Sequence, residues 1–159
     1  MPNPHTILLV EDDELLGRMI AELLRDEGYH VRTARNGFDG YSSYCRDQTE
    51  TVVTDIEMPE LNGFEMMGCI RNINPFVNTI YMSGAAERYR ETLAAEAGRF
   101  GASVLRKPFA SSDLLKLIIC SSVEPARARS SSRHEGLWAV RGSSFGNRQY
   151  DAAKNADRG

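Results

Sequence analysis

Residues 6–14 read TILLVEDDE, an apolar run that ends abruptly in four acidic residues. The run lacks polar alternation, which is typical of a strand that is buried on both faces. Behind it, leucines, Met19 and Ile20 recur at helical spacing, Asp13 stands at the expected helix N-cap, and Gly28 at the expected helix end. The stretch therefore predicts a buried strand, an acidic loop and a helix.

The same order of elements recurs four more times along the chain. Further strands are predicted at residues 29–34, 51–54, 77–82 and 102–106, and further helices at 37–47, 64–72, 85–99 and from 111 onward. Strands that alternate with helices in this way imply a parallel sheet with right-handed crossovers. We therefore predict an α/β fold over residues 1–120: a five-stranded parallel sheet, doubly wound, of the (βα)5 flavodoxin-like type.

The composition fits an ordinary globular domain, with 42% hydrophobic and 26% charged residues in a chain of 159. No apolar run approaches the ~20 residues that span a bilayer, and the N-terminus has no signal-peptide pattern. We therefore expect a cytoplasmic protein that makes no contact with membranes. The three cysteines Cys45, Cys69 and Cys120 are widely separated, and we expect reduced thiols in a core.

Residues 121–159 differ from the rest of the chain. They carry 7 Lys+Arg against 4 Asp+Glu, whereas residues 1–120 carry 12 against 18. This segment is rich in Ser and Arg and has too few large apolar residues to form a core. We expect a disordered or partner-docking basic tail, in which residues 137–140 (LWAV) form the one apolar island.

Polar and charged residues follow four of the predicted strands, at the point where each strand ends. They are Glu11, Asp12, Asp55, Ser83 and Lys107. Because the carboxyl ends of parallel strands share one edge of the sheet, these side chains are expected to converge there. Carboxylates that converge repel one another unless a cation lies between them. Oxygen ligands favour Mg²⁺, with Mn²⁺ as an alternative, over zinc.

Four segments together resemble the receiver domain of two-component response regulators. They are LLVEDD at residues 8–13, VTDIEMP at 53–59 with Asn62-Gly63, MSGA at 82–85 and LRKPF at 105–109. The resemblance covers about residues 5–120, and the motifs occur in order at near-standard spacing. No helix-turn-helix pattern follows residue 120, so the resemblance is to a single-domain receiver.

The resemblance implies a role for each residue of the cluster. Asp55 matches the phosphoacceptor, which attacks a phosphohistidine of a sensor histidine kinase or histidine phosphotransferase. Lys107 matches the lysine that pairs with the acceptor, and Ser83 the switch hydroxyl. The resemblance implies that Mg²⁺ is held by Glu11, Asp12, Asp55 and the backbone carbonyl of Glu57. Asp13 is expected to cap a helix and not to bind the metal.

Some features bear on the finer behaviour of such a domain. Val104 stands where receivers usually carry an aromatic switch residue, so an aromatic flip is not expected here. Residues 87–90 lengthen the segment before the fourth helix. Lys107–Pro108 matches a cis peptide of the family. Glu57 and Ala85 stand where receivers tune hydrolysis of the acyl phosphate.

The predicted function is that of a response regulator, which switches contacts with a downstream protein after phosphorylation and is not an enzyme in the ordinary sense. The resemblance also admits a homodimer through the fourth helix, fifth strand and fifth helix. Two alternatives stay open. A DNA-binding regulator would use the arginines of the basic tail, and a phosphatase of the haloacid dehalogenase type would need a second aspartate where Glu57 stands.

Overall fold

The computed structural model describes residues 3–123 and 138–139. Five strand–helix units follow one another, in the order that the hydrophobic pattern predicts. The elements are β1 (Asn3–Val10), α1 (Glu14–Asp26), β2 (His30–Ala34), α2 (Gly37–Arg46), β3 (Thr49–Asp55), α3 (Gly63–Ile73), β4 (Asn78–Ser83), the 3-10 helix η1 (Ala86–Tyr89), α4 (Arg90–Phe100), β5 (Ser103–Arg106), α5 (Ser111–Val123) and β6 (Trp138–Ala139).

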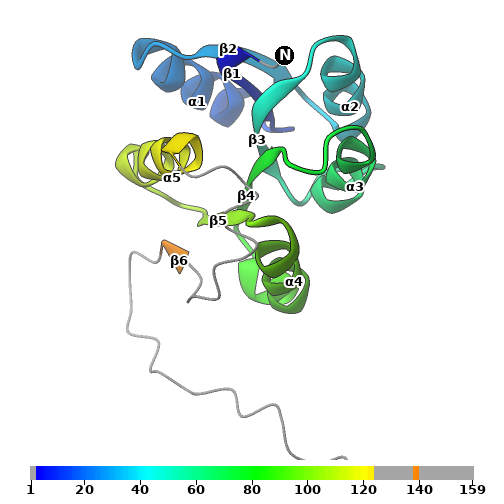
Figure 1. Ribbon diagram of the computed structural model, residues 1–159. Helices are drawn as coiled ribbons and strands as arrows, with labels where there is room; N and C mark the ends of the chain where they lie inside the picture. Colours follow the sequence, from blue (N-terminus) through cyan, green and yellow to red (C-terminus); the bar gives the residue numbers. More distant parts are fainter. Residues whose placement is uncertain (1–2, 124–137, 140–159) are drawn as a thin grey trace, which may run out of the picture.

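All strand pairs are parallel, and their order in the sheet is β2-β1-β3-β4-β5-β6. Strand order reverses beside β1, so the crossovers place helices on both faces. In Figure 1, α1 and α5 lie on one side of the sheet, and α2, α3 and α4 on the other. The predicted doubly wound (βα)5 fold is confirmed.

The sheet has one strand more than the five that were predicted. Trp138 pairs with Val104 and Ala139 with Leu105, so that β6 lies along the outer edge of β5. The edge strand of a sheet presents unpaired backbone groups that another extended segment can satisfy. Residues 138–139 belong to the apolar island of the basic tail. Residues 121–123, which were expected to belong to the tail, complete α5. The remaining residues, 124–137 and 140–159, lie outside the described part of the chain.

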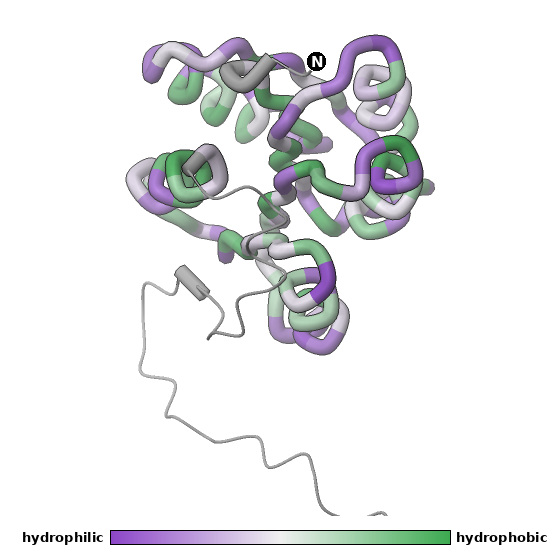
Figure 2. The backbone as a smooth tube through the Cα atoms, in the orientation of Figure 1, coloured by the Kyte–Doolittle hydropathy of each residue, from purple (hydrophilic) through white to green (hydrophobic). Residues whose placement is uncertain are grey.

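Each face of the sheet carries its own apolar core. Side chains of α1 and α5 pack against Ile7, Leu9 and Ile80, which point toward one face of the sheet. Side chains of α2, α3 and α4 pack against Leu8 and the other strand residues that point toward the opposite face. Figure 2 shows hydrophobic residues along the central strands. Burial on both sides explains why these strands have no polar alternation in the sequence.

Two helix starts fix the loops that carry the site. Asp13 caps α1, because its carboxylate accepts a hydrogen bond of 3.0 Å from the amide of Leu16. Asn62 and Glu65 form a capping box at the start of α3. The helix predicted over residues 85–99 is divided: η1 precedes α4, and this extra turn accounts for the added length before the fourth helix.

The cysteines are not in a core, contrary to the prediction. Cys45, Cys69 and Cys120 are all exposed, because each lies on the solvent side of its helix, α2, α3 and α5 respectively. Spacing alone did not reveal this orientation. Over the described part of the chain, no helix has the length and apolar character to cross a membrane.

Candidate functional site

Backbone hydrogen bonds align the strand ends that carry the polar residues. The amide of Glu11 donates to the carbonyl of Ala34 (3.1 Å), which holds the end of β1 against β2. On the other side, the amide of Lys107 donates to the carbonyl of Ser83 (2.9 Å). The register of the sheet therefore brings residues far apart in the sequence to one edge.

Three carboxylates meet at this edge. One carboxylate oxygen each from Glu11, Asp12 and Asp55 lies within 4.8 Å of the others. Glu11 and Asp55 are buried, with 3% and 6% of their surface exposed, whereas Asp12 is exposed. Burial raises the pKa of both Glu11 and Asp55, because a desolvated carboxylate is less stable in its charged form.

Lys107 supplies the positive charge of the cluster. Its Nζ lies 2.8 Å from Glu11 Oε2 and 3.2 Å from Asp55 Oδ2. Burial acts to lower the pKa of Lys107, but the hydrogen bond to Glu11 and the charges of Asp55 and Glu11 outweigh it and raise the pKa. The ammonium therefore stays charged between two acidic strand ends. The Lys107–Pro108 peptide is cis, as the sequence predicted.

The loop after β3 is fixed close to Asp55. The backbone amide of Glu57 donates to Asp55 Oδ1 at 3.3 Å, and the amide of Gly63 donates to the carbonyl of Ile56 at 3.0 Å. A Cβ on Gly63 would collide with the carbonyl of Asp55. Glycine is therefore required here for the start of α3 to approach the end of β3.

The segment after β4 is held on both of its sides. Ser83 is fully buried, and its Oγ accepts a hydrogen bond of 3.0 Å from the amide of Ala85. In η1, Glu87 forms an ion pair with Arg106 at the end of β5. Tyr89 donates from its hydroxyl to Glu57 Oε1 at 3.2 Å. These contacts hold η1 between the loops that follow β3 and β5.

The donor set fits a hard divalent cation. Glu11, Asp12 and Asp55 offer oxygen atoms only, and Lys107 leaves the carboxylate group with a net negative charge of two when all are ionised. Among the residues that the structure describes, neither His nor Cys contributes to this cluster. Oxygen ligands in this number suit Mg²⁺ or Mn²⁺, which keep several waters of their own.

The kind of domain that carries this cluster follows from a match to a known family. The model of the response regulator receiver domain matches residues 7–119, which contain all the residues of the cluster. The chain belongs to this family. Its acidic cluster, lysine and hydroxyl lie at the strand ends where the resemblance placed them, and the receiver domain is of the phosphoacceptor type.

Curated relatives agree with this assignment. The chain is 34% identical over 112 residues to the response regulator receiver protein CpdR of Brucella abortus, which covers 70% of this chain and 92% of that protein. It is 30% identical over 113 residues to the DNA-binding transcriptional regulator NtrC of Azospirillum brasilense, covering 71% of this chain. The match spans only 23% of NtrC, so several relatives are much longer than the matched region.

Solved structures show the same fold. The receiver domain protein of Clostridium thermocellum superposes with a TM-score of 0.66 at 28% identity, and covers 74% of this chain and 94% of its own. The receiver domain of the sensor histidine kinase PA1611 of Pseudomonas aeruginosa gives 0.67 at 25% identity, covering 76% and 98%. That structure has a magnesium ion coordinated in its active-site cleft.

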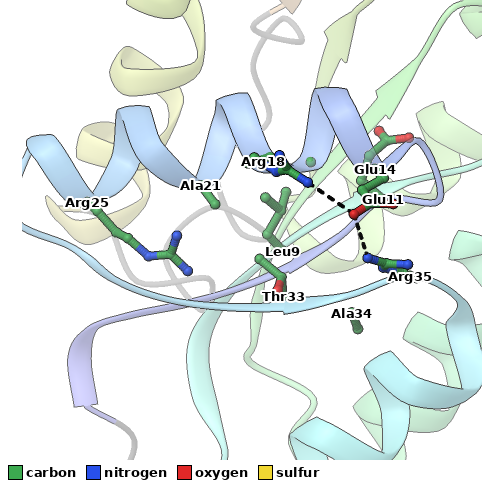
Figure 3. A pocket seen from close by; sticks show the side chains of 10 residues that line it. Leu9, Glu11, Glu14, Arg18, Ala21, Arg25, Thr33, Ala34 and Arg35 are labelled. Atoms are coloured by element: carbon green, nitrogen blue, oxygen red, sulfur yellow. Dashed lines mark hydrogen bonds and ion pairs between the residues drawn. The ribbon is translucent and has the colours of Figure 1, made fainter.

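A cavity of about 260 Å³ lies between α1 and β2, beside Glu11 but away from Asp55. Figure 3 shows that the guanidinium groups of Arg18 and Arg35 both reach Glu14. Arg25 donates to the carbonyl of Val31. Asp55, Lys107 and Ser83 do not line this cavity, which shares only Glu11 with the carboxylate cluster.

All predicted site residues therefore lie around the same strand ends. Asp13 is a helix cap and not a member of the carboxylate cluster, as expected. The sequence predicts no role in the site for Tyr89, Glu87 or Arg106. The only signal was the added length of residues 87–90, which gave no indication of which neighbours these side chains would contact.

Proposed function

We propose that Asp55 accepts a phosphoryl group from a phosphohistidine of a sensor histidine kinase or histidine phosphotransferase. The observation that carries this proposal is the ammonium of Lys107 at 3.2 Å from Asp55 Oδ2, inside a cluster of three carboxylates. A cation next to a carboxylate nucleophile can neutralise the phosphoryl oxygens as the group arrives. The carboxylates of the cluster, Asp55 included, would hold the metal.

In the transfer, a carboxylate oxygen of Asp55 forms a bond to phosphorus while the bond from phosphorus to the imidazole nitrogen breaks. The product is an acyl phosphate, and no base is needed because a carboxylate reacts in its ionised form. The ammonium of Lys107 then changes its partner from the Asp55 carboxylate to a phosphoryl oxygen. The hydroxyl of Ser83, whose oxygen accepts from the amide of Ala85, donates its own proton to another phosphoryl oxygen.

Mg²⁺, or Mn²⁺ in its place, would be held by Glu11, Asp12, Asp55 and the backbone carbonyl of Glu57, with Glu11 acting partly through water. When bound, it would offset the charge of the carboxylates and of the incoming phosphoryl group. The chain would thus promote its own phosphorylation and dephosphorylation without turning over a separate substrate.

The surface beside the site suits a docking partner. Leu15 and Met19 on α1 are 67% and 60% exposed, and α1 begins directly after the acidic loop. Large apolar side chains that remain exposed near a reactive group favour contact with another protein. We assign this side of α1 to the phosphoryl donor.

The output is proposed to be a change of contacts with a downstream protein. A homodimer through α4, β5 and α5 stays a prediction, and β6 covers part of the β5 edge that such a dimer would use. DNA binding through the basic tail is not favoured, and neither is a phosphatase activity. A cytoplasmic location is part of the same proposal.

The test is intact mass spectrometry after incubation with phosphoramidate, with and without Mg²⁺. We expect one phosphoryl adduct in the wild type that requires the metal, and none in Asp55→Asn. Glu57→Gln, which changes a neighbouring carboxylate but keeps its backbone carbonyl, should still form the adduct. Adduct formation in Asp55→Asn at the wild-type rate would overturn the proposal.

A further inference from the structure

A side-chain hydrogen bond spans the loops on either side of the Asp55 carboxylate. Tyr89, the last residue of η1, donates to Glu57 Oε1 at 3.2 Å. Glu57 in turn is tied to the acceptor through its backbone amide, which donates to Asp55 Oδ1 at 3.3 Å. The bridge therefore connects the acceptor's own loop to the segment that follows Ser83.

Aromatic packing fixes the position of the Tyr89 hydroxyl. The ring of Phe64 on α3 lies 5.7 Å from the Tyr89 ring in an edge-on arrangement. Phe64 also lies 4.9 Å from the ring of Tyr81, which is fully buried on β4. A ring held by such contacts loses little further entropy when its hydroxyl bonds to Glu57.

The hydroxyl of Tyr89 is also close enough to Asp55 to be affected by its charge. Partial burial, the charge of Glu57 and the hydrogen bond to Glu57 raise the pKa of Tyr89, and the charge of Asp55 adds to the same effect. The hydroxyl therefore keeps its proton at neutral pH and remains a donor. The ion pair between Glu87 and Arg106 holds η1 from its other side.

We propose that Tyr89 is a positioning residue that prolongs the phosphorylated state by holding the Glu57 carboxylate against η1. This inference rests on the proposed function. The Glu57 side chain is exposed and lies two residues after the acceptor. If it were free, its carboxylate could accept a hydrogen bond from a water beside the phosphoryl group and orient that water for attack. The bond to Tyr89 competes with such a water for the Glu57 carboxylate and favours the orientation in which that carboxylate faces η1.

The step in question is hydrolysis of the acyl phosphate. The oxygen of the water forms a bond to phosphorus, and the bond from phosphorus to the Asp55 carboxyl oxygen breaks. Asp55 recovers its carboxylate, and both protons of the water leave with the released phosphate as dihydrogen phosphate. No oxidant or further reactant takes part, so the rate depends on how readily a water is oriented in line with the breaking bond.

The test follows the decay of the phosphoryl adduct after the phosphodonor is removed, by intact mass with Mg²⁺ present throughout. We expect Tyr89→Phe, which keeps the ring but loses the hydroxyl, to lose its adduct about threefold to tenfold faster than the wild type. Tyr41→Phe, which removes a tyrosine hydroxyl on α2 that faces Cys45, should decay at the wild-type rate.

A double variant separates positioning from a merely structural effect. In the Glu57→Ala background there is no carboxylate to release, so Tyr89→Phe should leave the decay rate unchanged. Decay of Tyr89→Phe at the wild-type rate would overturn the inference, and so would an equal acceleration in the Glu57→Ala background. If the wild type takes up no phosphoryl group at all, the proposed function fails first and the inference falls with it.

Discussion

Tyr81 of β4 stands opposite Val104 of β5 in the parallel register, and both side chains are buried in the core shared with α3 and α4. In this pair of neighbouring positions, the aromatic ring therefore belongs to β4, two residues before Ser83, and β5 carries only a valine. The Tyr81 hydroxyl donates to Glu96 at 2.6 Å, and Glu96 also pairs with Arg71. Fixed at both its ring and its hydroxyl, Tyr81 serves packing, and no flip to the surface is expected.

Tyr81→Phe should lower the free energy of unfolding by about 1–3 kcal/mol at neutral pH, because the partly buried Glu96 carboxylate loses a hydrogen-bond donor. Burial raises the pKa of Tyr81 above its ordinary value. Its contribution is therefore fully present below the unfolded-state pKa of about 10 and is lost as the pH rises beyond it. In urea unfolding, the free energy of unfolding of the wild type and that of Tyr81→Phe should differ less near pH 10.5 than at neutral pH. A larger difference near pH 10.5 would contradict the role of the Tyr81 hydroxyl as a donor to Glu96.

Lys107→Met should slow phosphoryl uptake on the order of 10²-fold, because the only cation next to the Asp55 carboxylate in the described cluster is removed. The same change leaves the buried carboxylates of Glu11 and Asp55 without their partner, so the free energy of unfolding should fall by about 1–3 kcal/mol. Lys116→Met, at an exposed lysine of α5, is the matched control. Uptake by Lys107→Met at the rate of this control would exclude the proposed role.

Mg²⁺ should raise the unfolding temperature of the wild type, because a cation relieves the repulsion among Glu11, Asp12 and Asp55. At a concentration of about 100 times the dissociation constant, binding adds about 2.7 kcal/mol to the free energy of unfolding. Asp12→Asn should lose most of this effect. Glu14→Gln, whose carboxylate lies just outside the cluster and pairs with Arg18 and Arg35, should retain it. Differential scanning fluorimetry with and without Mg²⁺ compares the three proteins.

Alanine substitutions at Gly63 and Gly68, both on α3, are expected to have opposite effects on the stability of the fold. A Cβ on Gly63 would meet the backbone of Asp55 and Ile56, so Gly63→Ala should destabilise the fold by about 1–3 kcal/mol and slow phosphoryl uptake. A Cβ on Gly68 meets nothing within 4 Å, so Gly68→Ala should stabilise it by about 0.5–1 kcal/mol. Chemical denaturation of both variants is the measurement, and equal effects would show that the loop can move aside.

The sequence was sufficient to predict the strand–helix order and the convergence of the site, for a physical reason. Buried parallel strands are continuous apolar runs, and the residue that follows each run must lie at the shared carboxyl edge. Asp55 and Lys107 could be placed together on that basis alone. The distance between Asp55 and Lys107 and the burial of their side chains could not be predicted, because both depend on the register between strands.

What the sequence could not predict depends on side-chain direction and on edges. The exposure of Cys45 and of Met19 follows from how each helix is rotated on the sheet, which apolar spacing determines only approximately. The bridge from Tyr89 to Glu57 forms because the end of η1 lies beside the loop after β3, and no periodic pattern marks that turn. Pairing of β6 with β5 joins segments that are distant in sequence, so no local signal could indicate it.

Asp55 is the residue that we propose carries the phosphoryl group. After phosphoramidate and Mg²⁺, borohydride reduces an acyl phosphate of aspartate to homoserine, and peptide mass spectrometry then locates the reduced residue. We expect homoserine at position 55 in the wild type and at no position in Asp55→Asn. Reduction at Asp12 or Glu57 in place of Asp55, or homoserine formation that persists in Asp55→Asn, would contradict it.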